Sequence, residues 1–116
     1  MLQIERLELF EEKLGIKFDK LFAEFSPSYT LVCGAGKYKS IIINGEVHPH
    51  NGLEIEQNIR LIISAHDRSG RVLNSESVDV EASKFWGFDT FMVDMYIYSS
   101  PELVTKIRIY PTLGEE

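Results

Sequence analysis

The chain has 116 residues, of which 44% are hydrophobic and 26% are charged, the proportions of one ordinary globular domain and not of a disordered or fibrous chain. It contains 12 basic and 18 acidic residues, and the formal net charge of −6 opposes binding to nucleic acid, whose phosphates attract lysine and arginine. The one cysteine excludes an internal disulfide, and no apolar run approaches the roughly 18 residues of a membrane-spanning helix. Since acidic residues stand where a secretory signal would be basic, we expect a cytoplasmic protein that binds neither nucleic acid nor membrane.

The N-terminal part of the chain has apolar residues at helical spacing. They fall at steps of three and four residues: Ile4, Leu7, Phe10 or Glu11, and Leu14. Gly15 follows at the position of a C-terminal cap. The first nine residues also partly alternate, which is typical of a strand, and residues 16–25 fit either a second short helix or a strand. We expect residues 1–25 to form an N-terminal helical segment.

Residues 33–40, CGAGKYKS, contain the glycines, lysine and serine of a phosphate-binding loop. Such a P-loop requires glycine, four residues, then Gly-Lys-Ser/Thr. With Lys37 as the lysine, a leucine stands at the first glycine position and a tyrosine at the hydroxyl position. With Lys39, Cys33 and Tyr38 occupy the two glycine positions. The stretch therefore predicts a hairpin turn and not a nucleotide site, and we expect Cys33 to be a buried, inert thiol.

Between residues 29 and 111 apolar and polar residues alternate, which predicts strands with one buried face. The predicted strands span residues 41–47, 55–65, 71–80, 91–97 and 103–109. Apolar residues hold the odd-numbered positions in all of them except 71–80, whose irregularity predicts a bulge or an edge strand.

Turn-forming residues separate these strands. Asp67 and Gly70 open and close a four-residue stretch that is typical of a type I turn between antiparallel strands. No connection has the dozen residues that a parallel crossover needs. We predict a mainly β fold with one domain over residues 1–116, an antiparallel immunoglobulin-like β-sandwich of about six strands with an N-terminal helix.

A longer pattern runs through residues 43–93. It reads I-x-G-x-V, an Asn-Gly turn, an alternating strand ending in His66-Asp67, then D-x-x-G-R-V, a polar strand and F-x-V. This order resembles the FxLYD and related immunoglobulin-like β-sandwich modules of bacteria, although His66 stands where their pattern has tyrosine. The resemblance covers about half of the chain and implies an immunoglobulin-like fold with a non-catalytic, accessory or interaction role.

Three histidines form the one candidate metal site of the sequence: His48, His50 and His66, with Glu46 or Asp67 available to complete the coordination shell. If strands 41–48 and 55–66 pair as a hairpin, His66 lies at the far end from His48. Polar residues are also expected in the turn that Asn51-Gly52 predicts. We expect no cofactor and no metal, and keep a metal- or small-ligand-binding protein as the alternative interpretation.

Residues 85–91, FWGFDTF, hold four aromatic side chains around one glycine. The alternation predicts that at least two of them, Phe85 and Phe91, lie in the core. Trp86 or Phe88 is then the best candidate for an exposed partner-binding anchor.

Tyr96, Tyr98 and Tyr110 share the even parity of the last two predicted strands, opposite the core side chains. If those strands pair as a hairpin, the tyrosines form one patch for a protein partner or a homodimer. The alternatives are tyrosines lying flat on a solvated sheet or covered by the N-terminal helix. Since no nucleophile elbow or other catalytic signature is present, we expect a small non-enzymatic interaction or accessory module.

Overall fold

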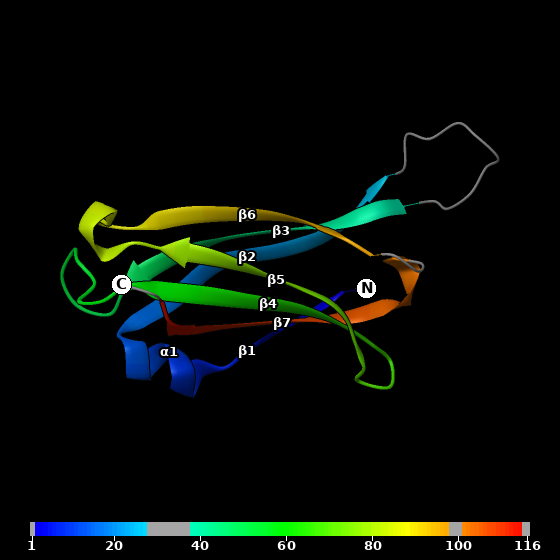
Figure 1. The fold of residues 1–116 in the computed structure, drawn as a ribbon, viewed down its shortest axis with the longest axis horizontal. Helices are drawn as coiled ribbons and strands as arrows, with labels where there is room; N and C mark the ends of the chain where they lie inside the picture. Colours follow the sequence, from blue (N-terminus) through cyan, green and yellow to red (C-terminus); the bar gives the residue numbers. More distant parts are fainter. Residues whose placement is uncertain (1, 28–37, 98–100, 115–116) are drawn as a thin grey trace.

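The computed structural model of the chain describes residues 2–27, 38–97 and 101–114 (Figure 1). Within them the chain is mainly β, and its elements follow in the order β1 (Gln3–Arg6), α1 (Glu8–Leu14), β2 (Ile16–Pro27), β3 (Tyr38–Pro49), β4 (Ile59–Asp67), β5 (Val72–Val80), η1 (Ala82–Lys84), β6 (Asp89–Tyr96), η2 (Pro101–Leu103) and β7 (Val104–Leu113).

Seven strands among the described residues form two sheets, which Figure 1 shows as two layers. One sheet has the strand order β1-β7-β4-β5 and the other has the order β2-β3-β6. Neighbouring strands pair antiparallel except β1 and β7, which are parallel. The hairpins β2–β3 and β4–β5 each stay within one sheet, whereas the chain changes sheet between β3 and β4, β5 and β6, and β6 and β7. The prediction of a mainly β, two-sheet arrangement is confirmed.

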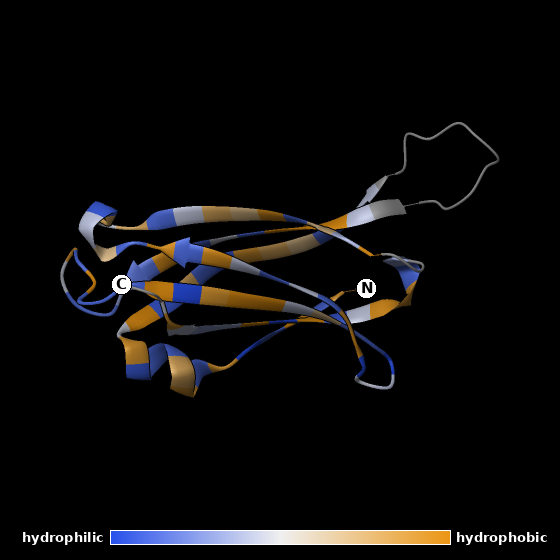
Figure 2. Ribbon diagram, viewed as in Figure 1, coloured by the Kyte–Doolittle hydropathy of each residue, from blue (hydrophilic) through white to orange (hydrophobic). Residues whose placement is uncertain are grey.

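The core between the sheets contains the side chains that the alternating pattern predicts. Ile41 and Ile43 of β3, Leu61 and Ile63 of β4, and Met95 of β6 are fully buried. Figure 2 shows apolar and polar residues alternating along these strands. Because successive side chains of a strand point to opposite faces, one parity of each strand is enough to fill the core. Burial of each large aliphatic side chain stabilises the fold by roughly 1.5–3 kcal/mol.

The N-terminal segment contains less helix than expected. The helix α1 covers only Glu8–Leu14 and ends at Gly15, whose φ of 72° is the left-handed conformation of a C-terminal cap, as predicted. The alternating start of the chain forms β1, where Ile4 pairs with Ile107 of β7. Residues 16–25 belong to the long strand β2, because pairing with β3 satisfies their backbone groups. The expected helical segment over residues 1–25 is therefore reduced to the seven residues of α1.

The turn prediction at Asp67 is confirmed. Strands β4 and β5 pair antiparallel on either side of it, the Gly70 amide donates to the Asp67 carbonyl at 3.0 Å, and Gly70 has a φ of 92°. The Asp67 carboxylate accepts hydrogen bonds from the Ser69 amide and hydroxyl and from the Arg71 amide. The irregular strand β5 lies at the edge of its sheet and has a register shift opposite Ala65, as its sequence predicts.

Candidate functional site

The aromatic segment 85–91 divides as predicted between core and surface. Phe85 and Phe91 are buried, whereas 66% of Trp86 and 51% of Phe88 are exposed. Gly87, with a φ of 80°, makes the bend, and its amide donates to the Leu53 carbonyl at 2.7 Å. The Phe88 ring is stacked on the His48 ring, with centroids 5.2 Å apart and planes 10° apart.

The predicted tyrosine patch does not form, because the last two strands belong to different sheets. Tyr96 lies on the outer face of β6, whereas Tyr110 lies on β7, where the Phe10 ring of α1 meets it edge-on at 5.7 Å. The helix therefore covers Tyr110, which is one of the alternatives that the sequence left open. Tyr98 lies outside the described residues. The premise of a hairpin between strands 91–97 and 103–109 is wrong.

The three histidines likewise do not form one site. His48 lies near the end of β3, and His50 follows that strand and is exposed. His66 is buried in β4, in the other sheet. Its Nδ1 donates to the Gly70 carbonyl at 3.0 Å, and its Nε2 accepts from the Ser64 hydroxyl at 2.8 Å, since a carbonyl can only accept. Both ring nitrogens of His66 thus hold the β4–β5 turn in place.

The residues 33–37 of the glycine-containing stretch, Cys33 among them, lie outside the described residues. The strands that flank them, β2 and β3, pair antiparallel as far as Pro27 and Tyr38. This pairing agrees with the predicted hairpin.

The most distinctive surface of the described residues is the outer face of the β2-β3-β6 sheet. Its side chains form cross-strand rows, which run from the end near Phe88 as Lys17 and His48; Asp19, Glu46 and Thr90; Phe22, Asn44 and Met92; Glu24, Ile42 and Asp94; Ser26, Ser40 and Tyr96. The middle row is unusually apolar for a surface, since 51% of Phe22 and 69% of Met92 are exposed. Tyr96 is half-exposed in the last row.

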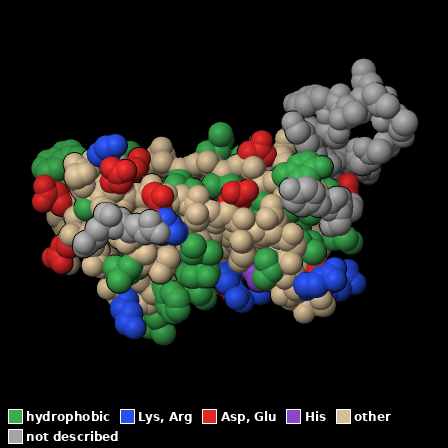
Figure 3. All heavy atoms as spheres, viewed as in Figure 1, with side chains coloured by type: hydrophobic (Ala, Val, Ile, Leu, Met, Phe, Trp, Pro, Cys, Tyr) green, Lys and Arg blue, Asp and Glu red, His purple; other side chains and the backbone are tan. Residues whose placement is uncertain are grey.

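Charge on this face is predominantly negative. Four carboxylates, those of Asp19, Glu24, Glu46 and Asp94, stand in rows on both sides of the apolar row. The two lysines of the same strands, Lys17 and Lys20, are exposed. Figure 3 shows in one view that most acidic side chains lie in the upper half of the molecule, where this sheet lies, and most basic ones in the lower half. The face therefore combines apolar contact area with negative potential.

The outer face of the β1-β7-β4-β5 sheet has the opposite character. Glu5 accepts a hydrogen bond from Arg108 Nε at 2.6 Å and lies 3.5 Å from Lys106 Nζ. The hydrogen bond from Arg108 is the main reason why the pKa of Glu5 is lowered, although burial opposes the shift. Asp79 accepts from Arg60 at 2.9 Å. Both carboxylates are thus neutralised within this face, unlike most of those on the β2-β3-β6 face.

A bulge in β2 shapes one end of the β2-β3-β6 face. The register shifts between Asp19 and Phe22, and Lys20 within the bulge has a φ of 52°, which is rare for a residue with a side chain. A bulge re-aims the side chains next to it, and Lys20 Nζ lies 3.8 Å from Glu46 Oε2. An open depression of about 370 Å³ lies beside it, lined by Lys20, Asn44, Gly45, Glu46, Thr90, Phe91 and Met92.

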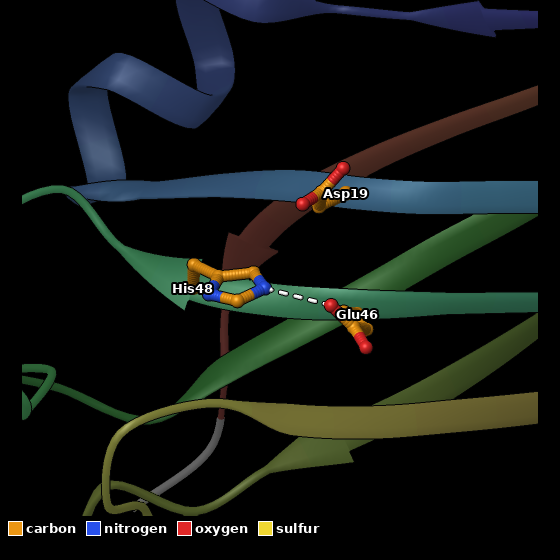
Figure 4. A group of neighbouring side chains, drawn as sticks. All are labelled: Asp19, Glu46 and His48. Carbon is orange, nitrogen blue, oxygen red and sulfur yellow. Dashed lines mark hydrogen bonds and ion pairs between the residues drawn. The ribbon is translucent and has the colours of Figure 1, made fainter.

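The bulge end of the face also brings together the one group of three metal-ligating side chains found in the described part of the chain: Asp19, Glu46 and His48 (Figure 4). One ligand atom from each lies within 4.8 Å of the others. His48 Nε2 is 2.9 Å from Glu46 Oε1. The spacing of Glu46 and His48, two apart in a strand, was visible in the sequence. Asp19 was not, because its place depends on the pairing of β2 with β3.

Comparison of the chain with protein-family models, with curated proteins and with solved structures gives no match. The resemblance of residues 43–93 to FxLYD-like modules therefore stays a prediction. In the described residues the longest helix, α1, has seven residues, and none is long and apolar enough to cross a membrane.

Proposed function

We propose that this protein is a small non-enzymatic interaction module, and that the β2-β3-β6 face binds a protein surface that is both apolar and basic. The observation that carries the proposal is the apolar row of Phe22 and Met92 between two rows of carboxylates. Removal of such exposed apolar area from water supplies binding free energy, roughly 25 cal/mol for each Å². The surrounding carboxylates would select lysine- and arginine-bearing partners and speed their association.

Charge also favours a different protein over a second copy of this chain. In a symmetric dimer the same patch contacts itself, so that the four carboxylates of one face would meet those of the other. Like charges across an interface cost several kcal/mol. Trp86 and Phe88, at the His48 end of the face, extend the apolar surface that the partner could contact.

The immunoglobulin-like class is the architecture that we propose for the two-sheet fold. In support, the strand motifs of the FxLYD-like pattern fall on successive strands: I-x-G-x-V on β3, the His66-Asp67 strand on β4, and F-x-V on β6. A module of this kind carries no catalytic machinery, which agrees with a binding role.

The proposal is tested by affinity purification from the native host with the full-length chain and a Phe22→Ser/Met92→Ser variant. The matched control is Leu9→Ser, because Leu9 is 78% exposed on α1, away from this face. We expect a protein that wild type and Leu9→Ser retain, that the double variant loses and that salt releases. Calorimetry with that protein purified then has to give a 1:1 complex with the same dependence.

Two results would contradict the proposal. One is that the folded double variant retains every protein that wild type binds. The other is sedimentation of the pure chain as a dimer that the double variant abolishes, which would make a second copy the occupant of the face.

A further inference from the structure

We propose that Asp19, Glu46 and His48 form a binding site for a divalent transition-metal ion, with zinc as the ion that best fits the donor set. The three side chains come from two neighbouring strands and point to the same face of the sheet (Figure 4). The inference is independent of the protein partner proposed above, since metal binding is measured on the purified chain alone.

The register of β2 and β3 creates a negative charge pair that a cation would stabilise. Asp19 lies directly opposite Glu46 in the antiparallel pair, and like charges in this position destabilise a sheet. Within the described residues the Asp19 carboxylate accepts one hydrogen bond, from the Lys20 amide at 2.8 Å, and forms no ion pair. Lys20 is the nearest lysine to Glu46, but its Nζ is 3.8 Å away and its side chain is 74% exposed. The internal cation thus neutralises this carboxylate pair poorly.

His48 is held in the orientation that a metal ligand needs. Its ring is stacked on Phe88, and its Nε2 donates to Glu46 Oε1 at 2.9 Å. A ring fixed by packing loses little further entropy when it binds an ion. A divalent ion would replace the proton on Nε2 and would bind the imidazole and the carboxylate together, with release of that proton.

The donor set selects the class of ion. One imidazole nitrogen and two carboxylate oxygens suit zinc and similar first-row ions, whereas magnesium and calcium prefer oxygen ligands alone. Zinc with three protein ligands completes a tetrahedron with water, and ligand atoms around it lie about 3.3 Å apart. Since the Asp19 side chain is exposed, rotation of its carboxylate can shorten the present separation of up to 4.8 Å. Lys20, by contrast, competes with the ion through its charge.

The test is isothermal titration calorimetry of the tag-free, full-length chain with zinc chloride in a buffer that does not chelate metals. We expect one zinc ion per chain and no binding of magnesium. His48→Gln and Asp19→Asn should each weaken zinc binding by at least about tenfold. Lys20→Gln should strengthen it severalfold, because a competing positive charge is removed. The matched control His50→Gln, two residues from His48 and exposed, should leave it unchanged.

Absence of zinc binding by wild type would overturn the proposal, and so would binding that His50→Gln abolishes and His48→Gln preserves. If circular dichroism shows that a variant is unfolded, nuclear magnetic resonance of the wild-type chain replaces it. Zinc then has to shift the imidazole signals of His48 at lower concentration than those of His50. The reverse order of the two histidines would refute the site.

Discussion

Gly45 of β3 lies directly opposite Phe91 of β6, and the Phe91 ring occupies the space that a side chain at position 45 would need. A Cβ atom at Gly45 would stand 2.7 Å from Phe91 Cζ and 2.6 Å from Leu21 Cδ2. The leucine tip can rotate, but the Phe91 ring is buried and meets Phe18 edge-on at 6.1 Å. The glycine is therefore required by packing and not by an unusual backbone conformation.

We expect Gly45→Ala to lower the free energy of unfolding by roughly 1–3 kcal/mol, the usual cost of overpacking a core. Urea denaturation followed by circular dichroism measures this loss. Combination with Phe91→Leu should cost less than the sum of the two single changes, because the smaller side chain relieves the clash. Strict additivity in this double-mutant cycle would show that Phe91 is not the obstacle.

The buried carboxylate of Glu11 depends on Arg6. Glu11 is 2% exposed, accepts from Arg6 Nη2 at 2.6 Å and Nε at 3.2 Å, and also accepts from the Phe18 amide. The hydrogen bond from Glu11 is the main reason why the pKa of Arg6 is raised. Arg6→Ala leaves this charge buried and unpaired, which should cost about 3 kcal/mol.

Glu11→Gln is the matched comparison for Arg6→Ala. Its amide oxygen can still accept a hydrogen bond, and Arg6, whose side chain is 35% exposed, can turn to water. Glu11→Gln should therefore cost less than Arg6→Ala in thermal and urea unfolding. An equal or larger cost for the glutamine variant would mean that the pair does not act through the burial of the carboxylate.

Asp67 should make stability depend on pH in the acidic range. Its pKa is lowered from the ordinary value of 3.8, chiefly by the hydrogen bond from the Ser69 hydroxyl, while burial opposes the shift. Because the folded pKa lies below the unfolded one, this contribution is fully present above about pH 3.8 and is lost as pH falls through the folded pKa.

Urea denaturation between pH 7 and pH 3 tests the role of Asp67. Asp67→Asn should be less stable than wild type at pH 7, and the difference should shrink toward pH 3. Glu24→Gln, which removes an exposed carboxylate on the other sheet, is the control for charge. A constant difference across the pH range would exclude the titration of Asp67 as its cause.

Lys20 occupies a backbone conformation that favours glycine, with a φ of 52°. Lys20→Gly removes the steric cost of this conformation but increases the entropy of the unfolded chain and removes the contact with Glu46. That contact is exposed and contributes little. We expect a change in unfolding free energy within about 1 kcal/mol of wild type, whereas Lys20→Val, with a β-branched side chain, should be clearly destabilising. Equal stability of the two variants would mean that the bulge relaxes when Lys20 is replaced.

The sequence by itself determined the features that depend on neighbours along the chain. Because side chains of a strand alternate between two faces, the positions of Ile41, Ile63 and Met95 followed from the pattern alone. The Gly15 cap and the turn from Asp67 to Gly70 were predictable for the same reason, since a few adjacent residues set their backbone geometry.

Only the tertiary structure decided which strands are neighbours. Strand order depends on how two sheets bury their apolar faces together, and several orders satisfy the same alternation. It separates Tyr96 from Tyr110 and His66 from His48, and it makes the start of the chain a strand beside β7. It also places Asp19 opposite Glu46, 27 positions apart in the sequence, through a pairing in which β2 is shifted by its bulge. The candidate site is a product of long-range pairing, which no local pattern of residues encodes.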